Sequence, residues 1–237
     1  MKFGLLFALV LLGGNLVWSE TVSFKAEDGI DLEGEFLAPA PGKVTLILLH
    51  GYQSSRSEWE PFAEFCNSKG LGVFYYDLRG HGNSQGLTDD FGKMVSDLDR
   101  AVKFLEEEFG VKRQKIAVSG ASIGANIALK NFYHNLSAPF TILLSPGLNY
   151  QGLTTGDMLS SCGSRPVLMA ASAGDLYAYG SVNTLERSVH KGQNITVVRL
   201  SSSAAHGVQM FRRSSTDPNE PSEFEKKIVK WVESHAR

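Results

Sequence analysis

The chain has 237 residues, of which 43% are hydrophobic and 20% are charged, and this composition suits one large globular domain with a sizeable core. Its formal net charge of −2 gives no electrostatic reason to expect a nucleic acid as a partner. Neither a low-complexity tract nor an internal repeat divides the chain into smaller units.

The first residues have the layout of a secretory signal peptide. Lys2 precedes an apolar run from Phe3 to Leu12, and Val17 and Ser19 fit the third and first positions before a cut. A membrane anchor is the alternative, but the run is short for crossing a bilayer. We therefore predict cleavage after Ser19, a single domain over residues 20–237, and a secreted or periplasmic protein without stable membrane insertion.

Next in the chain comes a predicted β-hairpin, with alternating apolar residues in Thr21–Lys25 and Ile30–Leu37 around a turn at residues 27–29. Beyond it, short apolar strands alternate with helices whose apolar residues recur every three or four positions. The further strands are predicted at Val44–Leu49, Gly72–Tyr76, Ile116–Ser119, Phe140–Leu144, Val167–Ala171 and Ile195–Leu200. The helices are predicted at Glu58–Ser68, Asp90–Phe109, Ile123–Tyr133, Tyr179–His190 and Ser222–His235.

This alternation predicts an α/β fold, with a mostly parallel sheet covered by helices on both faces and an antiparallel hairpin at one edge. In open sheets of this kind, ligands bind beyond the carboxyl ends of the strands. We therefore expect the functional residues in the segments that directly follow strands. Polar residues of chemical interest stand in five of these segments: His50, Asp77, Ser122, Asp175 and His206.

Ser122 lies in the sequence Gly120-Ala121-Ser122-Ile123-Gly124, between a predicted strand and a predicted helix. The two glycines allow strand and helix to approach closely, and the bend holds the serine outward in a strained backbone conformation. The pattern alone is weak in a chain rich in glycine and serine, and a helix-capping serine is the alternative. The strand before it and the helix after it favour a nucleophile.

A serine nucleophile needs a base and a group that orients the base. Of six histidines, His206 follows the last predicted strand, comes after the serine and is flanked by small residues. Asp175 directly follows the strand Val167–Ala171, and Asp157 is its nearest rival. We predict that Ser122, Asp175 and His206 form the catalytic set.

The remaining polar groups at the strand ends are predicted to have structural roles. His50 and His81 lie inside glycine-containing turns, and the other three histidines (His134, His190 and His235) lie near helix ends. Asp77 stands two residues before Arg79 and is interpreted as part of a turn-stabilising ion pair.

Two backbone amides are predicted to hold a developing oxyanion. The helix that begins at Ile123 leaves its first N–H groups without intrahelical acceptors, so the Ile123 amide faces the reaction. The turn after Val44–Leu49 places the Tyr52 amide beside the nucleophile.

With these residues in view, the sequence resembles the α/β-hydrolase family. The resemblance covers nearly all of the predicted mature chain. It rests on His50-Gly51, on the segment 77–84, on Gly120-Ala121-Ser122-Ile123-Gly124, on Gly174-Asp175 and on His206-Gly207. The segments "LLSPGLNYQG" and "AAHGVQMF" are most similar to small dienelactone-hydrolase-like esterases. The resemblance implies an eight-stranded sheet, a two-step acyl-enzyme mechanism and no cofactor.

The chain departs from many members of that family between Ser145 and Pro166, where a helical cap is often inserted. Only some twenty residues are available there, so we expect a minimal cap or none, an open site, and small or exposed acyl groups. Dienelactone hydrolases typically use a cysteine nucleophile, so their substrate is not carried over.

The expected activity is therefore a serine hydrolase of the carboxylesterase type, acting on a small-molecule ester. A peptidase or a thioesterase on the same residues is the alternative, and a non-catalytic binding protein on this scaffold is the third reading.

Two further features of the sequence concern cysteine pairing and glycosylation. Cys66 and Cys162 are expected to be unpaired thiols rather than a disulfide. Asn135 and Asn194 begin glycosylation sequons, which matter only in a host that glycosylates.

Overall fold

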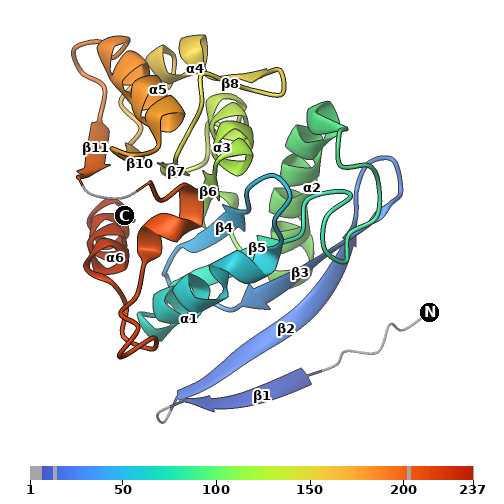
Figure 1. Cartoon of the computed structure of the whole chain (residues 1–237). Coiled ribbons are helices and arrows are strands. Elements are labelled where there is room, and N and C mark those ends of the chain that lie inside the picture. Colours follow the sequence, from blue (N-terminus) through green and yellow to red (C-terminus); the bar gives the residue numbers. More distant parts are fainter. Residues whose placement is uncertain (1–6, 13–14, 202–203, 237) are drawn as a thin grey trace.

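A computed structural model of the chain describes residues 7–12, 15–201 and 204–236. Nine strands of the described residues form one sheet in the order β1-β2-β3-β5-β4-β6-β7-β10-β11 (Figure 1). Their bounds are β1 Phe7–Leu12, β2 Asn15–Lys25, β3 Asp31–Leu37, β4 Thr45–Leu49, β5 Gly72–Tyr76, β6 Ile116–Ala121, β7 Thr141–Leu144, β10 Val167–Ser172 and β11 Ile195–Leu200. The strands β5, β4, β6, β7, β10 and β11, which are neighbours in this order, run parallel to one another. The pairs β1–β2, β2–β3 and β3–β5 are antiparallel.

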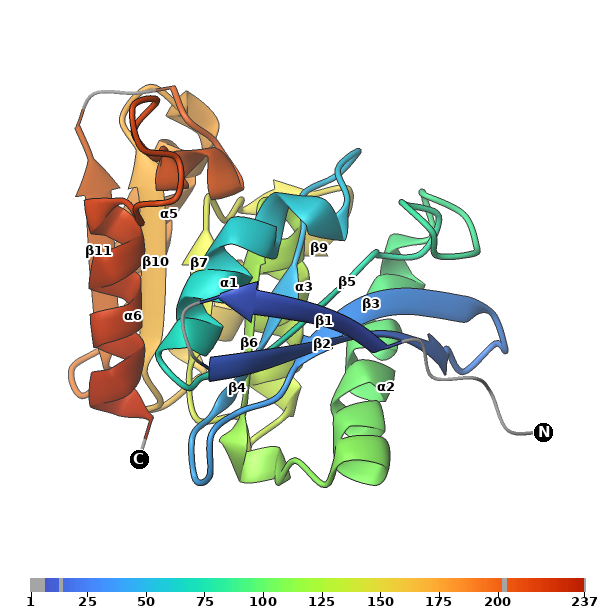
Figure 2. The ribbon, with the colours of Figure 1, turned by 90° about the horizontal axis from the view of Figure 1, so that it is seen from below.

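Helices cover both faces of the sheet, as Figures 1 and 2 show. On one face lie α1 (Glu60–Ser68) and α6 (Glu223–His235), whose apolar residues join the buried cluster of that side. On the other face lie α2 (Phe91–Phe109), α3 (Ile123–His134) and α5 (Leu176–Arg187). The strand residues divide between the two cores by alternation: in β4, Ile47 and Leu49 join one cluster and Leu46 and Leu48 the other.

The predicted mostly parallel eight-stranded sheet is confirmed, with β1 as an additional ninth strand. The eight predicted strands correspond to β2–β7, β10 and β11, although β2 begins at Asn15 rather than at Thr21. Strand β1 and the first residues of β2 fall inside the segment expected to be removed, so a cut after Ser19 would leave eight strands.

The predicted helices are present with shifted ends. The predicted helix Glu58–Ser68 is divided into a 3₁₀ turn, η1 (Arg56–Trp59), and α1, because Pro61 favours the first turn of an α-helix. The helix predicted from Tyr179 begins earlier, at Leu176, where the Asp175 side chain accepts a hydrogen bond from the Ala178 amide. Two short 3₁₀ elements, η2 (Arg113–Lys115) and η3 (Gly207–Phe211), complete the fold.

The segment between β7 and β10 carries only small elements. A hairpin of two-residue strands, β8 (Asn149–Tyr150) and β9 (Leu153–Thr154), is followed by the short helix α4 (Gly156–Ser160). This agrees with the expected minimal cap. Among the described residues, no helix combines the length and hydropathy needed to span a bilayer.

The two cysteines are unpaired and buried. Cys66 belongs to the core cluster under α1 and α6, and Cys162 belongs to the cluster on the opposite face of the sheet. Since the sheet lies between them, the expectation of two separate thiols is confirmed.

Candidate active site

Ser122 occupies the tight turn between β6 and α3. Its backbone has φ 55° and ψ −122°, in a region that favours glycine, so the turn is strained. A Cβ atom on Gly120 would lie 2.3 Å from the carbonyl carbon of Gly124, and one on Gly124 would lie 2.5 Å from the Leu49 oxygen. The turn therefore requires both glycines, as the sequence predicted.

Asp175 and His206 meet at the same edge of the sheet. The Asp175 carboxylate lies 2.6 Å from the His206 Nδ1, which must be the donor because a carboxylate only accepts. With Nδ1 as the donor to Asp175, Nε2 is the ring nitrogen whose lone pair can accept a proton from the nucleophile. The Asp175 side chain is 11% exposed and the His206 side chain 39% exposed, so the base is accessible from solvent.

The loop that carries the imidazole is held against the ends of three strands. A Cβ atom on Gly207 would lie 3.1 Å from that of Ala121, the residue before the nucleophile. The Gly207 amide donates to Ser145 Oγ at 2.9 Å, and Ser172 Oγ donates to the Ala205 carbonyl at 2.5 Å. The segments around positions 122 and 206 are therefore in direct contact.

A tyrosine, Tyr150, lies near both the serine and the histidine. No hydrogen bond joins Ser122 to His206 among the described residues, and the Tyr150 phenol is close enough to the serine side chain to interact with it. The Tyr150 ring is perpendicular to the His206 ring, with centroids 6.4 Å apart, and its hydroxyl donates to the Ser145 carbonyl at 3.3 Å. Burial raises the pKa of the Tyr150 phenol, so its hydroxyl stays protonated.

The loop after β4 lies against the nucleophile. A Cβ atom on Gly51 would lie 3.6 Å from Ser122 Cβ, and Tyr52 follows directly. The Gly51 amide donates to Glu58 Oε1 at 3.0 Å, while Ser54 Oγ donates to the other oxygen of that carboxylate at 2.5 Å. Burial raises the pKa of the Glu58 carboxyl. The sequence had not indicated Glu58, since no local pattern marks a side chain that reaches back to a loop.

The two predicted oxyanion donors belong to these two segments. Ile123 is the first residue of α3, so no carbonyl one turn back within the helix can accept its N–H. The Tyr52 amide follows Gly51, and no acceptor is found for it among the described residues. The Tyr52 ring is 38% exposed and packs against His81 and Phe91.

His50 and His81 make backbone contacts, consistent with the structural roles predicted for them. His50 is fully buried; its Nδ1 donates to the Gly51 carbonyl at 2.7 Å and its Nε2 accepts from the Leu78 amide at 2.9 Å. Burial lowers the pKa of His50 to about 4, which keeps it neutral at neutral pH. His81 likewise contacts the Arg79 carbonyl at 2.9 Å.

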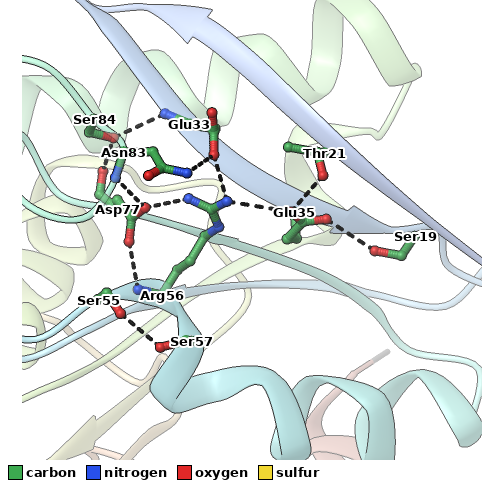
Figure 3. A network of polar contacts seen from close by, with 10 residues as sticks. All are labelled: Ser19, Thr21, Glu33, Glu35, Ser55, Arg56, Ser57, Asp77, Asn83 and Ser84. Atoms are coloured by element: carbon green, nitrogen blue, oxygen red, sulfur yellow. Dashed lines mark hydrogen bonds and ion pairs between the residues drawn. The ribbon is translucent and has the colours of Figure 1, made fainter. Parts of the chain in front are cut away.

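The predicted ion pair between Asp77 and Arg79 is wrong. Asp77 pairs with Arg56, whose guanidinium also contacts Glu33 at 2.6 Å and Glu35 at 3.5 Å (Figure 3). Arg79 instead pairs with Asp97 on α2 at 2.6 Å. After β5 the chain turns sharply, so two residues close in sequence take partners on different elements. Asp77 is still structural, because it also accepts from the Asn83 amide at 3.0 Å and so closes its own turn.

The rival carboxylate, Asp157, lies in α4, and its side chain is outside the described residues. Within the described residues, no cluster of histidine, cysteine or acidic side chains is arranged to hold a metal ion.

Comparisons with known proteins agree with this fold. The protein YfhR of Escherichia coli strain K12 is 32% identical over 117 residues, which cover 46% of this chain and 41% of the relative. A monoglyceride lipase homolog of monkeypox virus is 31% identical over 140 residues, 56% of this chain and 49% of the relative. The chain thus spans about half or less of the curated relatives that it matches.

Among solved structures, an esterase of Pyrococcus furiosus superposes with a TM-score of 0.77 at 20% identity, covering 93% of this chain and 92% of that one. At this identity the likeness shows the fold alone. A family model described as serine aminopeptidase, S33, matches residues 40–175, a span that includes Ser122 and ends at Asp175. Because this match covers more than half of the chain, the protein belongs to the serine aminopeptidase S33 family of α/β hydrolases.

Proposed function

We propose that this protein is a serine hydrolase that cleaves carboxylic esters through Ser122, His206 and Asp175. The observation that carries the proposal is the 2.6 Å contact between Asp175 and His206 Nδ1, formed beside the strained turn of Ser122. A largely buried acid that fixes the tautomer of an accessible imidazole, near a serine in a strained turn, is the arrangement needed to activate a hydroxyl.

In the proposed reaction, the Ser122 hydroxyl engages His206 Nε2, which takes its proton as Oγ attacks the ester carbonyl. The Tyr52 and Ile123 amides stabilise the resulting oxyanion. His206 then gives the proton to the departing alcohol, which leaves an acyl group on Ser122. Water, activated by the same imidazole, attacks this acyl-enzyme and releases the acid, so no cofactor is needed.

Ester substrates are favoured over peptides by the surroundings of Glu58. An aminopeptidase needs an anionic group to receive the substrate's ammonium terminus. Glu58 is a half-buried carboxylate beside the Tyr52 turn, and its two oxygens accept hydrogen bonds from Gly51 and Ser54, so the carboxylate is directed toward the loop. The names of two similar proteins, an esterase and a monoglyceride lipase homolog, also support ester cleavage.

The test is covalent labelling with a fluorophosphonate probe, combined with turnover of nitrophenyl esters from acetate to laurate. We expect labelling of Ser122 in the folded protein and none after heat denaturation. Ser122→Ala should lower turnover by about a millionfold, as in other serine triads. Ser215→Ala, which changes an exposed serine, is the matched control. Undiminished hydrolysis by Ser122→Ala would overturn the assignment of the nucleophile.

A further inference from the structure

Tyr150 lies in the β8–β9 hairpin, which hydrogen bonds hold against the neighbouring helices. Gln151 and Gly152 join β8 to β9 and have φ values of 51° and 84°, as a type I′ turn requires. On one side of the hairpin, buried Asn126 of α3 donates to the carbonyls of Gly147 at 3.0 Å and Leu153 at 2.7 Å. Its oxygen also accepts from the Gly147 amide at 3.0 Å, so the hairpin is fixed to the helix that begins after the nucleophile.

The other side of the hairpin is braced by Tyr177, near the start of α5. The Tyr177 hydroxyl donates to the Asn149 carbonyl at 2.8 Å and accepts from the Asn149 amide at 3.0 Å. Its ring meets the Tyr150 ring edge to face, with centroids 5.4 Å apart. Figure 1 shows the hairpin, α3 and α5 gathered at one end of the molecule.

These fixed aromatic rings are accompanied by exposed apolar surface. Tyr177 is 49% exposed although two backbone hydrogen bonds hold its hydroxyl, and its neighbour Leu176 is 81% exposed. Both residues directly follow Asp175, the acid of the proposed triad. Ordering an aromatic side chain while leaving its face in water stabilises the fold little, whereas a pre-organised apolar face reduces the entropy lost when a ligand binds.

The position of this surface indicates which part of a substrate it meets. His206 must protonate the departing alcohol, so the alcohol leaves on the side of the imidazole. Tyr150 lies on that side, because its ring meets the His206 ring at right angles with the two centroids 6.4 Å apart.

We propose that Tyr150, Tyr177 and Leu176 form an aromatic wall that binds the alcohol portion of the ester and selects apolar, planar alcohols such as benzyl alcohol over small alkyl alcohols. This inference rests on the proposed esterase function and adds to it the class of alcohol. Aromatic contacts of this kind change affinity by about three- to tenfold, so the selectivity is measurable.

The test compares benzyl acetate with ethyl acetate, which share the acyl group. For each substrate, the kcat/KM of a variant is divided by the kcat/KM of the wild type. This ratio cancels the difference in intrinsic reactivity between the two esters. We expect Leu176→Ser and Tyr150→Leu to lower this ratio about three- to tenfold more for benzyl acetate than for ethyl acetate, mainly through KM. Tyr150→Phe keeps the ring and should keep the selectivity.

Leu136→Ser is the matched control, since Leu136 is 77% exposed in the loop after α3. A second measurement does not depend on ester turnover: benzyl alcohol should slow fluorophosphonate labelling of the wild type and should slow that of Leu176→Ser less. The aromatic wall would be overturned if the variants lost kcat/KM equally for both acetates and if benzyl alcohol slowed labelling of the wild type and of Leu176→Ser equally. Absence of labelling and of all turnover would instead contradict the proposed function.

Discussion

Among single residues, His50 links the site to the stability of the fold. Its imidazole orients the Gly51 carbonyl beside the nucleophile, and it must remain neutral to accept from the Leu78 amide. Its pKa of about 4 lies below the ordinary histidine value of about 6.5 that applies when the chain is unfolded. Below pH 6.5 the unfolded chain therefore binds a proton that the folded chain does not, and stability is lost as the pH falls toward 4.

This difference predicts the pH dependence of unfolding. Between pH 7 and pH 4, the free energy of unfolding of the wild type should fall by about 3 kcal/mol more than that of His50→Gln, whose amide can make the same two hydrogen bonds without titrating. Urea unfolding at the two pH values measures both quantities. The same pH dependence in the two proteins would show that His50 is not held neutral.

Glu58 is a second residue whose effect extends beyond its own position. Its carboxylate holds the Gly51 amide and thereby sets the path of the loop that carries the Tyr52 donor. Glu58→Ala should lower kcat/KM by about tenfold or more, because loss of an oriented oxyanion donor is costly, whereas Glu58→Gln should retain most of the activity. Glu60→Ala, at an exposed position two residues further along the chain, is the control. If it lowered kcat/KM as much as Glu58→Ala does, the loss would come from the stability of the helix and not from the loop.

Among the elements, the turn between β6 and α3 leaves no room for added side-chain atoms at Gly120 and Gly124. Gly124 approaches the Leu49 and His50 carbonyl oxygens so closely that a methyl group would lie 2.5 Å and 2.7 Å from them. Gly124→Ala should therefore destabilise the protein by about 3 kcal/mol. Gly156→Ala, in α4, meets nothing within 4 Å and should change stability by less than about 0.5 kcal/mol. Denaturant midpoints of the two variants decide the comparison.

The elements also show how far the sequence alone could predict the fold. The buried strands and long helices were predictable because their apolar residues form continuous runs in the strands and recur every three or four positions in the helices. The β8–β9 hairpin was not, since strands of two residues have no period. The residues of the proposed triad were predictable from their places after strands, whereas Tyr150, Glu58 and the partner of Asp77 depend on contacts between segments far apart in the chain.

At the level of the whole molecule, we propose that the chain is exported and cut after Ser19. Such a cut would leave β3 at its place in an eight-stranded sheet, with the rest of β2 still paired to it from Glu20 to Lys25. Ser19 donates to Glu35 at 3.1 Å, but Thr21 also donates to that carboxylate, at 2.7 Å, and would remain (Figure 3).

Expression of the full chain in a secreting host tests this prediction. The protein recovered outside the cell, or in the periplasm, should begin at Glu20 when its terminus is sequenced and its intact mass is measured. A Ser19→Arg variant, which replaces the small residue at the cut with a large charged one, should be processed poorly. Recovery of uncut wild-type protein from the cell interior would contradict export.

The three hydrogen bonds of Asn126 have a consequence for how substrates enter. Because this single amide joins α3, which begins after the nucleophile, to both sides of the β8–β9 hairpin, we expect the helix and the hairpin to move together. Substrates would then bind without displacement of the hairpin, and the rate of turnover would not be limited by its opening and closing.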